Sequence, residues 1–138
     1  MKPFIILDTN VLISALMCPN SPSSRAVTNA FHYFQPIASH STWDEFESVS
    51  GRKKFERFYS AEDRTMFLYL LAQSTRIMDV TVTTEDCRDP KDNQFLNLAL
   101  SSSCQLIVSG DADLRSMNPY NGVSIISPAE FLALLTSH

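Results

Sequence analysis

Glycine is scarce in this chain of 138 residues. The three glycines are Gly51, Gly110 and Gly122, and none lies near another. The GxGxxG turn of dinucleotide-binding proteins and the P-loop both need clustered glycines, because their backbone N–H groups must approach phosphate oxygens closely. The sequence therefore excludes both motifs and disfavours an ordinary nucleotide-cofactor enzyme.

Cysteine and long apolar runs are also scarce. The three cysteines, Cys18, Cys87 and Cys104, are odd in number and show no C-x-x-C spacing, which argues against a disulfide framework or a zinc site. The apolar run at residues 4–7 is shorter than the ~7–15 residues of a signal-peptide core. No stretch approaches the ~20 apolar residues of a membrane span. We therefore expect reduced thiols, a cytoplasmic location and no membrane partner.

The chain has no excess of positive charge. It carries 11 Lys and Arg against 15 Asp and Glu, for a net charge of −4, so it lacks the overall basic surface that binds nucleic acid by counterion release. One basic cluster is present, formed by Arg52, Lys53, Lys54 and Arg57. A solvated face is the default interpretation of this cluster, and an edge that contacts nucleic acid is the alternative.

Short apolar runs typical of buried strands alternate with segments of helical spacing. Strands are expected at residues 4–7, 36–39, 78–82, 105–108 and 123–126. Helices are expected at 10–17 and 24–34, from a capping box at Ser41 to near Gly51, from Ser60 to about Ile77, from Asp92 onward, and from Ser127 onward. This alternation predicts an α/β fold of three α/β/α layers around a central, mostly parallel sheet. The length fits one domain over residues 1–138.

Four acidic residues fall where such a fold binds ligands. Asp8 directly follows the first expected strand, and Asp111 follows the strand at 105–108. In an open α/β sheet, ligands bind outside the carboxyl ends of the strands, and the N-termini of the helices point toward the same edge. Asp92 begins one expected helix and Glu45 lies on the first turn of another. We therefore expect these four carboxylates to converge.

A converged set of carboxylates needs a positive partner. Two unit charges about 4 Å apart repel by roughly 4 kcal/mol at an effective dielectric constant near 20. A hard divalent cation such as Mg²⁺ or Mn²⁺ would neutralise the cluster, lower the pKa of a bound water and hold the oxygens of a phosphodiester. The simpler interpretations are helix capping or turn formation for the aspartates, Asp89 before Pro90 included, and a helix-dipole contact for Glu45.

Three blocks of the sequence resemble PIN-domain proteins. These are ILDTNVLISAL at residues 6–16, DPKDNQFLNLAL at 89–100 and LIVSGDADL at 106–114, and the segment 123–132 is also similar. The order and spacing of the three blocks are specific, and the resemblance covers nearly the whole chain. It is strongest to the bacterial branch related to VapC toxins, the toxin components of toxin–antitoxin systems.

The resemblance implies a metal-dependent endoribonuclease on a small parallel-sheet fold. Its acidic quartet would be Asp8, Glu45, Asp92 and Asp111, with Asp113 as an accessory acid and Asn10, Thr9 and Ser109 as supporting polar residues. Either Asp44 or Glu45 could match the family's glutamate, and the helical phase of Phe46 and Val49 favours Glu45.

The resemblance also implies the cofactor and the partners. These would be Mg²⁺ or Mn²⁺, an RNA substrate, a small antitoxin protein of a type II toxin–antitoxin system, and a second copy of the chain in a homodimer. The basic cluster at Arg52, Lys53, Lys54 and Arg57 could then steer the RNA strand.

Two other functions remain open from the sequence. One is a PIN-like module that binds or regulates without catalysis. The other is an aspartyl-phosphate phosphatase or receiver-like switch with Asp8 as the nucleophile. The second is disfavoured because the D-x-D of the phosphatases is D-T-N here, with Asn10 in place of the second acid, and because no lysine follows the strand at 105–108.

Overall fold

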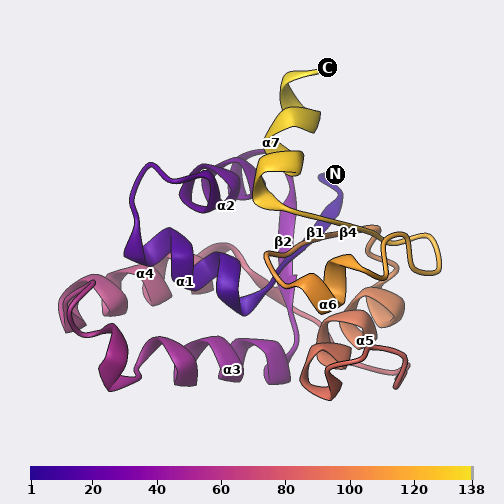
Figure 1. The fold of residues 1–138 in the computed structure, drawn as a ribbon, viewed down its shortest axis with the longest axis horizontal. Helices are drawn as coiled ribbons and strands as arrows, with labels where there is room; N and C mark the ends of the chain where they lie inside the picture. Colours follow the sequence, from indigo (N-terminus) through magenta and orange to yellow (C-terminus); the bar gives the residue numbers. More distant parts are fainter. Residues whose placement is uncertain (138) are drawn as a thin grey trace.

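The computed structural model describes residues 1–137, which form a five-stranded sheet flanked by helices (Figure 1). The strands are β1 (Phe4–Leu7), β2 (Gln35–Ala38), β3 (Arg76–Ile77), β4 (Leu106–Val108) and β5 (Ser124–Ile126). Their spatial order is β3-β2-β1-β4-β5, and every neighbouring pair is parallel. The strand β1 is therefore central, with Leu7 opposite Val108 of β4.

Helices cover both faces of this sheet. They are α1 (Thr9–Met17), α2 (Pro22–Tyr33), α3 (His40–Ser50), α4 (Ala61–Ser74), α5 (Asn93–Ser102), α6 (Ala112–Arg115) and α7 (Pro128–Thr136), with short 3₁₀ turns η1 (Lys53–Phe55) and η2 (Pro90–Asp92). Figure 1 shows α1, α3 and α4 on one side of the strands and α5 and α6 on the other. The predicted three-layer α/β/α fold with a parallel sheet is confirmed.

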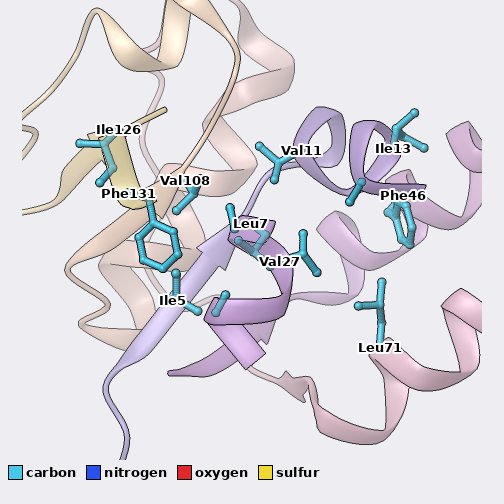
Figure 2. Packing of buried hydrophobic residues seen from close by; sticks show 13 residues of the cluster. Ile5, Leu7, Val11, Ile13, Val27, Phe46, Leu71, Val108, Ile126 and Phe131 are labelled. Carbon is cyan, nitrogen blue, oxygen red and sulfur yellow. The ribbon is translucent and has the colours of Figure 1, made fainter. Parts of the chain in front are cut away.

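Alternate residues of β1 point to opposite faces, as the period of two in a strand requires. Ile5 and Leu7 belong to a hydrophobic cluster shared with α1, α2, α3, α4 and α7, whereas Ile6 belongs to a second cluster shared with α5 and α6. Figure 2 shows the first cluster, in which Phe46 of α3 and Phe131 of α7 are the largest buried side chains. Two cores on the two sides of β1 thus hold its carboxyl end in place.

Several expected element boundaries are wrong. The strand expected at 78–82 is absent, because β3 pairs with β2 only through Arg76 and Ile77 and the chain then runs over α5, where the amides of Thr81 and Val82 donate to Ser101 Oγ. The preceding helix accordingly ends at Ser74 and not near Ile77.

Helix starts also differ in part from expectation. The capping box of α3 is formed by Ser39 and Thr42, so this helix begins before the expected Ser41. The side chain of Asp92 makes no capping hydrogen bond to α5. The expected capping box of Ser127 and Glu130 is present at α7.

Within residues 1–137, no helix combines the length and the apolar character needed to cross a membrane.

Candidate active site

The carboxyl end of β1 opens into a cleft of about 280 Å³. Its lining includes all four predicted acids, Asp8, Glu45, Asp92 and Asp111, together with Asp89. Three basic side chains, Arg52, Lys54 and Lys91, and the rings of Phe55 and Phe95 complete much of the wall. The structure therefore brings together carboxylates that are up to 103 positions apart in sequence, between Asp8 and Asp111.

Asp8 is the most deeply buried of these acids, with 2% of its surface exposed. It is the N-cap of α1, where its Oδ1 accepts a hydrogen bond of 2.8 Å from the amide of Val11, and its Oδ2 accepts one from the Ser109 hydroxyl. Burial raises the pKa of Asp8 from 3.8 to about 6. The two hydrogen bonds oppose this rise in pKa, and the charges of Asp111 and Glu45 add to it.

Asp92 and Asp111 interact directly across the cleft. Burial, a hydrogen bond with the Asp111 carboxyl group and the charge of Asp111 raise the pKa of Asp92 to about 8. Burial would also raise the pKa of Asp111, but the hydrogen bonds from Asp92 and from the amides of Leu114 and Asp113 lower it below its usual value. Burial and the neighbouring Asp111 carboxylate therefore both favour the protonated form of Asp92.

Glu45 is held by donors on both of its oxygens. The hydroxyl of Thr9 donates to Oε1, and the amide Nε2 of Gln94 donates to Oε2 at 2.8 Å. The neighbouring Asp44 is exposed and lines a different hollow, beside Gly51 and Arg64. Of the two acids that the sequence left open, the structure places Glu45 in the cleft.

Asp113 and Asp89 lie at the margin of the site. Asp113, the expected accessory acid, does not line the cleft and forms an ion pair of 2.7 Å with Arg88. Carboxylate oxygens of Asp89, Asp92 and Asp113 nevertheless lie within 4.8 Å of one another. Sequence reasoning gave Asp89 only a turn role, and it does accept a hydrogen bond from the amide of Lys91. The spacing of three residues between Asp89 and Asp92 is the feature of the sequence that could have indicated that Asp89 lies near the site.

The donor set fits a hard divalent cation. Within residues 1–137, Asp92 Oδ2 is the buried side-chain oxygen that has no hydrogen-bond partner. A buried oxygen of this kind costs free energy unless something binds it. It is surrounded by carboxylates, which are the ligands that Mg²⁺ and Mn²⁺ prefer. Asn10, Thr9 and Ser109, the expected supporting residues, all lie beside these acids.

The expected basic cluster divides in the structure. Arg52 and Lys54 line the cleft, whereas Lys53 and Arg57 are exposed and lie outside its lining. Lys91 is a third cation of the cleft that sequence reasoning missed, because it is isolated in the sequence. None of the three cleft cations forms an ion pair with a carboxylate of residues 1–137, so their charge is available to an anionic ligand.

An acid-lined cleft at the carboxyl edge of a parallel sheet defines a class of α/β proteins that bind ligands beside the central strand. Within that class, the family model of the PIN domain matches residues 4–113. The chain therefore belongs to the PIN-domain family, whose members are generally nucleases.

Individual proteins are similar to this chain in sequence or in fold. The chain is 27% identical over 121 residues to an uncharacterized protein of Methanocaldococcus jannaschii, MJ1680, covering 85% of this chain and 76% of that protein. Among solved structures it is similar to VapBC2 from Rickettsia felis bound to a DNA fragment from its promoter, with a TM-score of 0.59 and 12% identity over 88% of this chain and 96% of that one. It is also similar to the PIN domain of T. brucei RRP44, with a TM-score of 0.52 and 12% identity over 99% of this chain and 83% of that one.

Proposed function

We propose that this protein is an endoribonuclease that depends on Mg²⁺ or Mn²⁺ and hydrolyses RNA phosphodiester bonds. One observation carries the proposal: Asp8, Glu45, Asp92 and Asp111 line one cleft, and within it a buried oxygen of Asp92 has no hydrogen-bond partner. Membership of a family of nucleases supports the same reaction class.

In this proposal the four acids hold one or two cations, with Asp113 as an accessory ligand. A bound divalent cation supplies a Lewis acid that activates water and stabilises charge on a phosphoryl group. Ser109 and Thr9 orient the carboxylates of Asp8 and Glu45 through the hydrogen bonds described above. A bound cation would favour the ionised forms of Asp92 and Asp111, because its positive charge would offset the repulsion between their carboxylates.

The RNA strand would be held by the basic side chains around the cleft. Arg52 and Lys54 lie on one wall and Lys91 on the segment that carries Asp92, so that phosphates on both sides of the reacting bond meet positive charge. Lys53 and Arg57 extend this contact outward from the cleft. Asn10, which is exposed at the start of α1 and lines the cleft, would contact the RNA strand near Asp8.

The biological setting belongs to the same proposal. We infer that residues 1–138 form a single PIN-like domain that acts in the cytoplasm as the toxin of a type II toxin–antitoxin system, forms a homodimer and is inhibited by a small antitoxin protein. The similarity of the fold to a chain of a VapBC complex supports this inference.

A cleavage assay tests the proposed activity. Wild-type protein is incubated with a panel of structured RNAs in Mg²⁺, in Mn²⁺ or in EDTA, beside Asp8→Asn and the matched control Asp44→Asn. We expect cleavage by the wild type and by Asp44→Asn in either cation, and none in EDTA or with Asp8→Asn. Asp44→Asn is an informative control because this acid adjoins Glu45 in sequence but lies outside the cleft.

Binding of Mn²⁺, followed by electron paramagnetic resonance, is measured on the same proteins. If the folded wild-type protein binds Mn²⁺ but cleaves no RNA, the nuclease proposal is wrong and the protein is a catalytically silent PIN module. Wild-type protein that binds no Mn²⁺ would show that the converged acids do not form a metal site.

A further inference from the structure

Gln94 joins two sides of the acidic cleft. It lies two residues after Asp92, on the first turn of α5. Its Nε2 donates to Oε2 of Glu45 at 2.8 Å, and its Oε1 accepts from the Ser41 hydroxyl at 2.7 Å. Both polar atoms of the Gln94 side chain are thus bonded to α3, with Ser41 four residues before Glu45 on that helix.

The chemistry of these groups fixes the direction of each hydrogen bond. A carboxylate can only accept, so the NH₂ group of Gln94 must face Glu45 and its carbonyl must face Ser41. The Ser41 hydroxyl then has to donate. Thr9 donates to the other oxygen of Glu45, so each oxygen accepts one hydrogen bond and keeps a further lone pair for another ligand.

The two helices that the Gln94 side chain links, α3 and α5, pack on opposite faces of the sheet. Phe46, next to Glu45, is buried in the core cluster on one face, and Phe95, next to Gln94, is buried in the cluster on the other face. The main buried side chains of α3 and α5 thus belong to different cores. A side chain that bonds one helix to the other therefore sets the position of Glu45 relative to Asp92 across the cleft.

We propose that Gln94 is a positioning residue, which holds Glu45 in the orientation that binds the cation of the active site, with Ser41 completing the arrangement. This inference rests on the proposed function, because it assigns Gln94 a role at the same site. Residues that hydrogen-bond to metal ligands typically contribute 10–100-fold to metal affinity. Gln94 should therefore act on cation binding even though it is not itself a ligand.

A double-mutant cycle on Mn²⁺ affinity tests this role. Wild type, Gln94→Met, Glu45→Gln and the double variant are titrated with Mn²⁺, with free Mn²⁺ followed by electron paramagnetic resonance. Methionine keeps the length of the side chain and removes both hydrogen bonds. We expect Gln94→Met to weaken Mn²⁺ binding about 10-fold in the wild-type background. In the Glu45→Gln background it should cause no further loss, because the residue through which it acts is already changed.

Two further variants serve as controls for this experiment. Gln73→Met makes the same substitution at an exposed glutamine of α4 away from the cleft, and its Mn²⁺ affinity should equal that of the wild type. Gln94→Leu also removes both hydrogen bonds and adds no charge, so it should bind Mn²⁺ about as weakly as Gln94→Met does. It also supplies the measurement if Gln94→Met does not fold.

The outcomes separate this inference from the proposed function. Equal Mn²⁺ affinity of wild type and both Gln94 variants would overturn the role of Gln94 and leave the nuclease proposal standing. The same loss of affinity in both backgrounds would show that Gln94 does not act through Glu45, which also overturns it. A wild type that binds no Mn²⁺ would overturn both proposals together.

Discussion

Replacing Asp8 with asparagine should make the metal-free protein more stable at alkaline pH. The pKa of Asp8 is about 6 in the folded protein, against 3.8 for the free side chain. A group whose pKa is raised on folding adds stability below its unfolded pKa, and that contribution is lost as the pH rises through the folded pKa. The difference between 3.8 and about 6 corresponds to roughly 3 kcal/mol of the free energy of unfolding at pH 8.

Part of this gain is offset by a lost hydrogen bond. Asparagine can still accept from the amide of Val11, but its NH₂ group would face Ser109, so the Ser109 hydroxyl can no longer donate to this side chain. Losing the Ser109–Asp8 hydrogen bond costs on the order of 1 kcal/mol. We therefore expect a net gain of about 2 kcal/mol for Asp8→Asn at pH 8. At pH 4 the gain should disappear, because Asp8 is then protonated in the folded protein.

Urea denaturation in EDTA at pH 4, 6 and 8 measures this dependence. The single tryptophan, Trp43, contacts the ring of Phe46 in the core and reports unfolding by fluorescence. Adding Mn²⁺ at pH 8 should stabilise the wild type and not Asp8→Asn, since only the wild type binds the ion tightly. A stability gain that is absent at pH 8, or that is equally large at pH 4, would refute the assignment of the pKa shift to burial of the Asp8 charge.

Three further predictions concern the scaffold. Phe46→Ala should lower the free energy of unfolding by about 3–5 kcal/mol, because a fully buried ring is removed, and a loss below about 1 kcal/mol in urea denaturation would contradict the packing described. Arg64→Met should cost about 1–3 kcal/mol, because Arg64 donates at 2.8 Å to Ser50 Oγ and at 2.6 Å to the carbonyl of Glu47 at the end of α3, and an unchanged melting temperature would argue against this link. Ser127→Ala should cost about 1 kcal/mol through loss of the α7 cap, whereas Ser127→Asp should restore most of it in the same thermal measurement.

The sequence predicted the parts of the site that local rules control. Asp8 and Asp111 were identifiable because each directly follows an apolar run, and the end of a buried strand fixes where the next side chain lies. Each of the two aspartates also caps the helix that follows it. The capping role and a role in the acidic cleft are therefore compatible in the same residue. Glu45 required the helical phase of Phe46, which the structure bears out by burying that ring.

Other features depend on contacts between distant segments. Gln94 looked like an ordinary helix residue, because its partners Ser41 and Glu45 are about 50 positions earlier in the chain. The expected strand at 78–82 has a suitable alternation, but after the amide of Met78, which donates to Ala38 of β2, the amides of Thr81 and Val82 donate to Ser101 of α5 and not to a strand. Periodicity in one segment carries no information about which other segment will meet it.

The position of the cleft follows from the order of the strands. Neighbouring strands β1 and β4 end side by side, but the chain leaves them toward opposite faces: Val11 of α1 enters one core and Leu114 of α6 enters the other. Two segments of the chain that leave adjacent strand ends toward opposite faces of the sheet form a crevice between them. The hollow is thus a property of the backbone path, and the acids determine only its chemistry. Surface insertions into the connection 79–86, which contributes no residue to the cleft lining, should therefore leave the hollow in place.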